Sequence, residues 1–266
     1  MKPVAKMMIG AALLTAFGML GAQEAPAELN SVNDWNKNAR ITEADGVINV
    51  KNNTGLYSKK KFVIDPAKKY TLKLTCRAVN IENEGDKSQV FAGFSVFDKK
   101  GRILNSFNCC VVPGTMTEVV EDAPKGATVV KVKDASKFRK LYGTLNADAK
   151  EDLSDLPNFN MLGYTTAFEK KDDAWEITLL KPLARPLKAG TMVRQHSRGG
   201  YLYTAGWKMV GKEWVTLSGS ISGIKKGFWT GKFWPEGAAK AQVVILANWQ
   251  KKNLETQIKD ISITVE

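Results

Sequence analysis

Two tryptophans, Trp229 and Trp234, lie close together in residues 228–237, among glycine, threonine, lysine and proline. This composition is typical of a loop, and a loop of that length does not need two indole rings to complete a core. Indole faces pack against the C–H surfaces of sugar rings, while amide and charged side chains bind the sugar hydroxyls. The pair therefore predicts a carbohydrate-binding site, with packing inside the protein as the alternative.

Four other side chains have the chemistry to extend such a site. Trp249 and Asn248 lie at the end of an apolar run that begins at residue 242, a position from which both side chains reach the rim of a sheet. Tyr203 leads into the same C-terminal part, and Arg77 lies on the polar side of an alternating pattern. Amide and guanidinium groups bind hydroxyls, although a solvated strand face contains the same residue types. We expect these four residues to line the ligand site together with the two loop tryptophans.

Three further tryptophans fit packing better than binding. Trp175, Trp207 and Trp214 fall within predicted strands, where large aromatic side chains commonly pack on a sheet face. We favour this interpretation for Trp214 in particular, because an alternating apolar pattern follows it.

No residue pattern singles out a catalytic centre. His196 is the single histidine of the chain, and the Gly-x-Ser-x-Gly turn that presents a hydrolytic serine does not occur. A structural role at a junction is therefore the preferred interpretation of His196. Glu118, Glu121 and Asp122 are the nearest approach to a carboxylate cluster. Because the fold positions the paired carboxylates of glycan hydrolases, a glycan hydrolase or lyase stays an alternative to a binding protein.

Three cysteines, Cys76, Cys109 and Cys110, leave two alternatives. Adjacent cysteines rarely bond each other, because the ring strains the peptide between them, so one of the two would pair with Cys76 across strands. Otherwise all three are buried thiols, since Cys76 lies on the apolar side of its strand pattern. No Cys-x-x-Cys spacing occurs, which argues against zinc binding and thioredoxin-like redox chemistry.

The charge balance indicates what kind of partner the chain suits. The 266 residues include 39 basic and 27 acidic side chains, a net charge of +12. The basic residues are spread along the chain, and no nucleic-acid-binding motif accompanies them. The charge suits an anionic surface or polymer, including an acidic polysaccharide, and equally serves solubility. We expect carbohydrate as the partner, no nucleic acid and no required cofactor.

Residues 1–22 have the pattern of a secretory signal peptide. Two lysines precede an uncharged apolar run at residues 7–20, and two small residues follow at the predicted cleavage point before Gln23. The run is too short to span a membrane as a helix, and no later stretch is apolar enough. We expect an exported mature chain of about 244 residues (266 − 22) with a charge of +10 and no membrane span. Its expected location is the periplasm, the cell surface or the medium.

Alternating hydrophobicity dominates the mature chain. Residues 70–78 and 259–265 alternate between apolar and polar side chains, whereas residues 89–97 and 242–248 are apolar on both faces, as central strands are. Turn signals separate these runs, and no amphipathic helical repeat exceeds about three turns. The pattern predicts an all-β fold, an antiparallel sandwich or barrel.

The two ends of the mature chain together resemble the galactose-binding-like, jelly-roll family of carbohydrate-binding modules. The similarity consists of an N-terminal tryptophan, two short strand motifs, a Trp-x-x-x-Ser-Gly strand and a closing alternating strand. These motifs are Trp35, residues 46–50, residues 62–74, residues 214–219 and residues 258–265. The resemblance implies carbohydrate binding by a discontinuous jelly-roll β-sandwich formed by residues 30–116 and 198–266.

The same resemblance implies a structural calcium ion. In the resembling modules, a carboxylate on the last strand often binds calcium near the N-terminal strand, and Asp260 occupies that place here. Calcium requires six to eight oxygen ligands, and the sequence identifies no second one. The acidic residues 148–155 lack the spacing of an EF-hand loop and fit a solvated loop.

Residues 117–197 differ from their flanks. Short strands are expected near residues 126–134, 161–168 and 175–180, and a long polar stretch separates the first from the second. The block resembles small β-barrel inserts of exported and phage-tail proteins, although the Gly-Asp step usual in those inserts is replaced by Arg139-Lys140. We expect residues 117–197 to form a small β-subdomain inserted into the sandwich.

The expected function is that of an exported, non-catalytic carbohydrate-binding protein. Aromatic stacking and polar side chains would recognise a poly- or oligosaccharide. The alternatives are a secreted glycan-degrading enzyme and a structural or protein-interaction module of the cell envelope.

Overall fold

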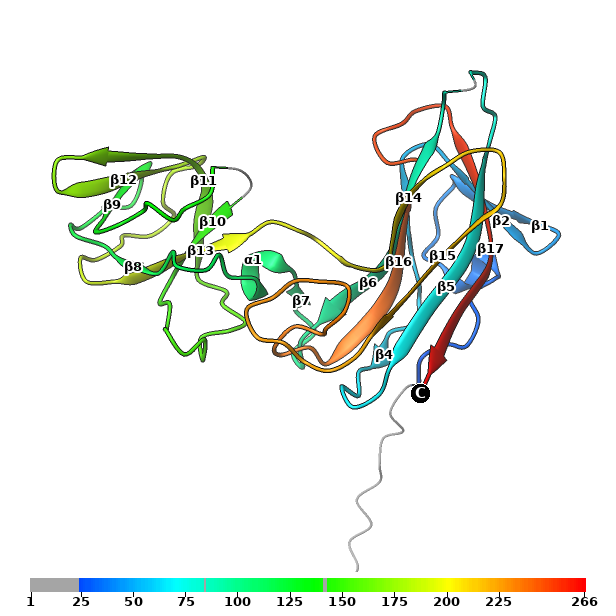
Figure 1. Ribbon diagram of the computed structural model, residues 1–266, viewed down its shortest axis with the longest axis horizontal. Coiled ribbons are helices and arrows are strands. Elements are labelled where there is room, and N and C mark those ends of the chain that lie inside the picture. The colour runs from blue at the N-terminus through cyan, green and yellow to red at the C-terminus, as the bar shows by residue number, and fades with distance from the viewer. Residues whose placement is uncertain (1–23, 84, 141–142) are drawn as a thin grey trace, which may run out of the picture.

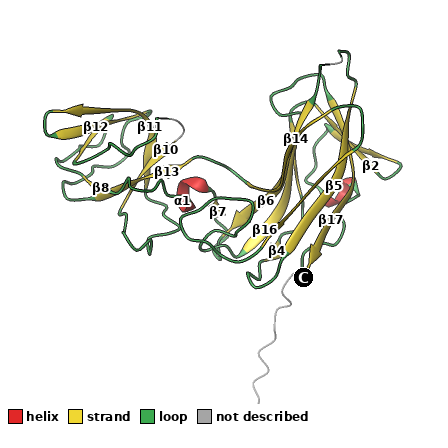
Figure 2. Ribbon diagram, in the orientation of Figure 1, coloured by secondary structure: helices red, strands yellow, loops and turns green. Residues whose placement is uncertain are grey.

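The chain folds into three antiparallel sheets joined mainly by loops (Figures 1 and 2). The computed structural model describes residues 24–266 except residues 84 and 141–142, so the predicted signal peptide lies outside the described residues. Strands account for 49% of the structure and helices for 3%. The prediction of an all-β antiparallel sandwich is confirmed.

Two sheets face each other and enclose the larger core. The first has the strand order β1-β2-β17-β5-β15, and the second has the order β14-β6-β16-β3. In the second sheet, the short strand β4 also pairs with β16, and β7 pairs with β6. The first sheet comprises β1 (Ile41–Ala44), β2 (Val47–Lys51), β17 (Glu255–Val265), β5 (Tyr70–Val79) and β15 (Val215–Ile221). The second comprises β14 (Leu202–Val210), β6 (Ser88–Phe97), β16 (Lys240–Ala247), β3 (Thr54–Tyr57), β4 (Phe62–Val63) and β7 (Ile103–Leu104).

The burial pattern of the strands follows their sequence alternation. Along β5, every second side chain from Tyr70 to Ala78 is buried, while the polar residues between them face outward. Phe62, Phe94 and Trp234 join Tyr70 in an aromatic cluster between the sheets, with neighbouring ring centroids 5.4–5.8 Å apart. Burial of these large rings contributes to the apolar stabilisation of the sandwich, together with the aliphatic side chains around them.

Residues 117–197 contribute every strand of the third sheet, which has the order β8-β13-β10-β11-β12-β9. Figure 1 shows it at the opposite end of the long axis from the sandwich. It has a hydrophobic cluster of its own around Val130, Leu145 and Ile177. That this part is an independently folding insert stays a prediction. Its strands are β8 (Thr117–Glu118), β9 (Val129–Val132), β10 (Gly143–Ala147), β11 (Met161–Lys171), β12 (Ala174–Leu179) and β13 (Met192–Ser197).

A short helix, α1 (Ser106–Cys109), connects the sandwich to the third sheet. The Asn105 side chain caps its first turn, and the Ser106 hydroxyl donates to the carbonyl oxygens of Ser197 and Gly199. Asn146 on β10 donates from Nδ2 to the carbonyl oxygen of Phe107 at 3.0 Å. These bonds satisfy buried polar groups at the junction. The 3-10 turn η1 (Val32–Asp34) lies in the N-terminal part of the sandwich.

Candidate functional site

The outer face of the second sheet presents an exposed aromatic pair. Val90, Ala92 and Phe94 of β6 point into the core, so Phe91 between them points outward. Trp207 of β14 lies directly opposite Phe91 in the antiparallel register, and their ring centroids are 6.1 Å apart. The Trp207 side chain is 59% exposed, which leaves most of the indole available to a ligand.

Further rings extend this pair across the sheet. Phe91 also contacts Tyr203 at 4.8 Å and Trp249 at 6.3 Å between centroids. Tyr203 is 6.2 Å from Tyr201, which is in turn 6.1 Å from the Tyr57 ring on β3. We call this continuous set the aromatic platform. It consists of Tyr57, Phe91, Tyr201, Tyr203, Trp207 and Trp249.

A close crossing of the chain places the platform tyrosines. A Cβ atom at Gly93 would lie 1.8 Å from the carbonyl oxygen of Leu202, so only glycine permits the chain to cross β6 there. The register of β14 against β6 shifts between Leu202 and Gly206 at the same point. This irregularity lays Tyr201 and Tyr203 over the sheet, where the Tyr201 and Tyr57 hydroxyls hydrogen-bond each other at 2.7 Å.

The platform combines apolar faces with neutral polar groups. Burial, together with the Tyr201 hydrogen bond, raises the pKa of the Tyr57 phenol, and burial raises that of Tyr203. Both phenols therefore stay protonated at neutral pH and can donate or accept hydrogen bonds. Val244 and Leu246 of β16 are buried beneath the rings. Such a surface suits an uncharged, ring-containing ligand with both apolar and hydroxyl faces.

Two of the predicted site residues, Tyr203 and Trp249, belong to the platform. Tyr203 is half-buried and Trp249 is 38% exposed. The backbone nitrogen of Trp249 donates to the carbonyl oxygen of Gln89, which fixes the start of its loop beside β6. Tyr203 and Trp249 both contact the Phe91 ring, which lies more than 100 residues before them in the sequence.

The predicted loop tryptophans do not form a binding face. Trp234 is 0% exposed and packs edge-on against Tyr70 in the core, so the expectation that it contacts a ligand is corrected. Trp229 is half-buried, and its Nε1 donates to the carbonyl oxygen of Tyr201 at 3.1 Å. The polar edge of Trp229 is therefore used inside the protein, and its hydrogen bond supports the segment that carries the platform residue Tyr201.

Asn248 also requires a correction, because its side chain is completely buried. Its Nδ2 donates to the carbonyl oxygens of Val50 and Asn52 at 3.0 and 2.9 Å, and its Oδ1 accepts from the Thr256 hydroxyl. With its amide used internally, Asn248 ties strands of both sheets together. A local apolar run could not reveal the Val50 and Asn52 carbonyl partners, which lie 198 and 196 residues away.

Arg77 lies on the other side of the sandwich, on the outer face of the first sheet. Its Nε donates to Gln257 Oε1 at 2.8 Å, and its guanidinium lies 4.6 Å from the centre of the Trp214 ring. Arg77 and the platform therefore cannot share one ligand, and that expectation is corrected. Trp214 packs on this sheet face, between Arg77 and Lys259.

Four platform residues, Tyr57, Phe91, Tyr201 and Trp207, were not among the predicted site residues. Trp207 was assigned to packing, and neither Phe91 nor Tyr57 carried a motif. Phe91 falls in a run that is apolar on both faces, so its sequence context cannot tell an outer ring from a core ring. The usable signal was the polar and small composition around Trp207, which is untypical of a buried strand.

Asp260, the predicted calcium ligand, lies at an irregular point of the last strand. Asp260 is exposed at a register shift in β17, with a φ of 51°. The nearby Asn30 Oδ1 accepts a hydrogen bond from the Ile261 nitrogen and is therefore engaged. Among the residues that the structure describes, no three His, Cys, Asp or Glu side chains gather as a metal site. Backbone carbonyl oxygens and waters can also supply calcium ligands, so a calcium ion at Asp260 stays a prediction.

The three cysteines and His196 are largely shielded from solvent. All three cysteines are free thiols, with Cys76 and Cys109 buried and Cys110 half-buried. His196 is completely buried, beside Arg194 on β13. Burial and the neighbouring Arg194 charge lower the pKa of His196 to about 3. The imidazole is therefore neutral in the folded protein at neutral pH, and solvent does not reach it.

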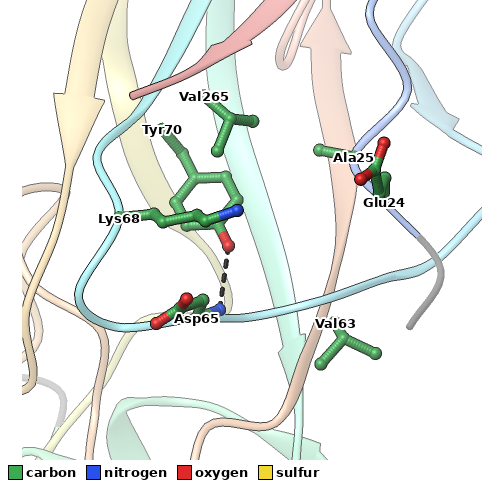
Figure 3. A pocket seen from close by; sticks show the side chains of 7 residues that line it. All are labelled: Glu24, Ala25, Val63, Asp65, Lys68, Tyr70 and Val265. Atoms are coloured by element: carbon green, nitrogen blue, oxygen red, sulfur yellow. Dashed lines mark hydrogen bonds between the residues drawn. The ribbon is translucent and has the colours of Figure 1, made fainter. Parts of the chain in front are cut away.

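Hollows also occur elsewhere on the surface. Figure 3 shows one of about 380 Å³ between the β4–β5 turn and the end of β17, where Tyr70 Oη accepts from the Asp65 nitrogen. Its wall includes Glu24, Asp65 and Lys68, so charges of both signs face the same space. None of the predicted ligand residues lines it.

No protein-family model matches the chain, and no curated protein is significantly similar to it. The described part of the chain contains no helix with the length and apolar character needed to cross a membrane. The proposed function therefore depends on the geometry of the surface.

Proposed function

We propose that the protein binds a carbohydrate, a poly- or oligosaccharide, on the aromatic platform of the second sheet. The observation that carries this proposal is the unbroken run of six rings on one outer sheet face, ending in the exposed indole of Trp207. Contiguous exposed aromatic surface on a soluble domain marks an interaction site.

The ring arrangement favours a sugar chain over a compact ligand. The platform extends across the order β14-β6-β16-β3 of the sheet, from Trp207 on β14 to Tyr57 on β3. Pyranose rings can stack on Trp and Phe faces, while the phenols and the half-buried Gln89 and Gln242 amides supply hydrogen bonds. An extended surface of this kind matches several consecutive sugar units.

The resemblance to galactose-binding-like carbohydrate-binding modules supports the same proposal. Those modules are β-sandwiches that bind glycans without cleaving them. Export through the predicted signal peptide would bring the protein to environmental or cell-surface glycans. We propose accordingly that the protein is a non-catalytic binding module.

Affinity electrophoresis on a panel of neutral and acidic polysaccharides tests the proposal. Trp207→Ala and Trp249→Ala are expected to weaken binding by about ten-fold or more, because each removes an exposed stacking face. Trp214→Ala, on the outer face of the first sheet, is the matched control and is expected to bind like the wild type. The exposure of Trp207 predicts that its removal leaves folding intact.

Retarded migration of the wild type that Trp207→Ala abolishes would support the platform as the site. No retardation by any glycan in the panel would overturn carbohydrate binding. Equal loss in Trp207→Ala and Trp214→Ala would instead place the ligand elsewhere.

A further inference from the structure

A second exposed apolar surface lies on the loop between β15 and β16, whose Trp229 also contacts the segment that carries Tyr201. Ile224, Phe228 and Phe233 of this loop are 45%, 48% and 39% exposed. Lys225 Nζ lies 4.1 Å from the centre of the Phe228 ring and 5.3 Å from that of Phe233. The two rings are therefore at most about 9.4 Å apart (4.1 + 5.3), and a bridge between Ile224 and Trp234 places Ile224 beside them.

The loop holds these side chains in a fixed arrangement. Trp234 fills the core, its backbone nitrogen donates to the carbonyl oxygen of Gly223, and the Lys225 nitrogen donates to the Trp234 carbonyl. At the other side, the Val111 nitrogen donates to the carbonyl oxygen of Gly227. The exposure of the three apolar side chains is thus not a consequence of a loosely held loop. Trp234 anchors the loop in the core and Trp229 bonds internally to the Tyr201 carbonyl oxygen, so neither tryptophan provides a binding face.

Basic residues surround the three apolar side chains. Lys99 and Lys100 line the same surface hollow as Ile224, so their turn lies beside the loop. No ion pair of the described residues involves Lys99, Lys100 or Lys225. We call Ile224, Phe228, Phe233, Lys99, Lys100 and Lys225 the apolar–basic patch.

Few carboxylates offset this charge. Asp98 is paired with Arg102 at 2.7 Å, and hydrogen bonds from Ser154, together with the nearby Lys226 charge, lower the pKa of the Asp152 carboxyl. Glu236 is the remaining acidic side chain in the hollow. The balance around the three apolar side chains stays positive, which is complementary to an anionic surface.

We propose that the apolar–basic patch seats the protein on an anionic lipid bilayer. Exposed Phe and Ile side chains enter the boundary between headgroups and acyl chains, and flanking lysines contact the anionic headgroups. A rigid loop loses little conformational entropy on this contact. The patch shares no residue with the aromatic platform.

Co-sedimentation of the mature protein with vesicles tests the proposal. The probes are phosphatidylcholine vesicles with about one-third phosphatidylglycerol, and vesicles of phosphatidylcholine alone. We expect binding to the anionic vesicles that falls with added salt, and little binding to the neutral ones. The double variants Phe228→Ser/Phe233→Ser and Lys99→Glu/Lys100→Glu are each expected to bind about ten-fold more weakly.

Matched controls separate the patch from general effects. Met209→Ser removes another exposed apolar side chain and Lys212→Glu another exposed lysine, and both are expected to sediment like the wild type. Trp207→Ala is also expected to retain vesicle binding, which distinguishes this inference from the proposed glycan site. Unchanged urea midpoints of all variants would show that they are folded.

Three results would overturn the inference: no sedimentation of the wild type with anionic vesicles, equal sedimentation with neutral vesicles, or wild-type binding by both patch variants. Patch-dependent binding of soluble dextran sulfate without vesicle binding would assign the patch to an acidic polysaccharide instead.

Discussion

Arg194 Nη2 donates to Asp155 Oδ2 at 2.7 Å, and both side chains are almost completely shielded from solvent. Asp155 also accepts from Asn158 Nδ2 and from the Lys150 nitrogen, while Arg194 Nη1 donates to the Lys150 carbonyl oxygen. The ion pair thereby fixes the loop after β10 against β13. It lies close to the junction with the sandwich, where Asn158 donates its backbone N–H to the Asn108 carbonyl oxygen.

Asp155→Asn is expected to destabilise the protein by about 3–5 kcal/mol, because it leaves the Arg194 charge buried without a counter-charge. The measurement is urea unfolding followed by circular dichroism. Asp148→Asn is the matched control, since Asp148 forms only an exposed, 3.9 Å pair with Arg185. Its removal is expected to cost less than about 1 kcal/mol. Similar losses of unfolding free energy in both variants would contradict a stabilising role of the buried Arg194–Asp155 pair.

Acid is expected to weaken the fold through His196. The folded-state pKa of about 3 lies below the ordinary 6.5, so below pH 6.5 the unfolded chain binds a proton that the folded protein does not. The stability associated with the neutral imidazole is complete above pH 6.5 and decreases as pH falls, by up to about 1.4 kcal/mol per pH unit. Unfolding free energies at pH 7, 6 and 5 measure this slope.

His196→Gln provides the comparison for that slope. Glutamine cannot take up a proton in this range, and carboxylate contributions are common to both proteins. The variant is therefore expected to lose less stability than the wild type between pH 7 and pH 5. Identical slopes of unfolding free energy against pH would show that the pKa of His196 is the same in the folded and unfolded states.

Gly93→Ala is expected to destabilise the sandwich by about 1–3 kcal/mol and to weaken glycan binding. The added methyl group would overlap the Leu202 carbonyl oxygen and displace the segment that carries Tyr201 and Tyr203. Urea unfolding and affinity electrophoresis measure the two effects. Gly211→Ala is the control, because nothing lies within 4 Å of a Cβ atom there. Normal stability and binding of Gly93→Ala would refute the close crossing.

Thiol titration is expected to count three free cysteines in the unreduced, denatured protein. In the native state all three should react slowly, because burial raises the pKa of Cys76 to about 12 and raises that of Cys109 and Cys110. Cys110 should react first, since it is only half-buried. A count of one thiol in the denatured chain would instead indicate a disulfide.

The alternating pattern of residues 70–78 was sufficient to predict β5, because side chains on successive residues of a strand point to opposite faces. Alternation also predicted β17, whereas runs that are apolar on both faces predicted β6 and β16; together they indicated the all-β class. Local composition also marked residues 228–237 as an irregular segment between strands.

The site itself depended on contacts that no local pattern contains. The hydroxyls of Tyr57 and Tyr201 meet across a separation of 144 residues, and Phe91 meets Trp207 only because β6 pairs with β14. Trp234 and Asn248 have the residue types of a binding site, yet long-range packing buries both. Sequence alternation determines which strands form, whereas strand order and close crossings determine which side chains face solvent together.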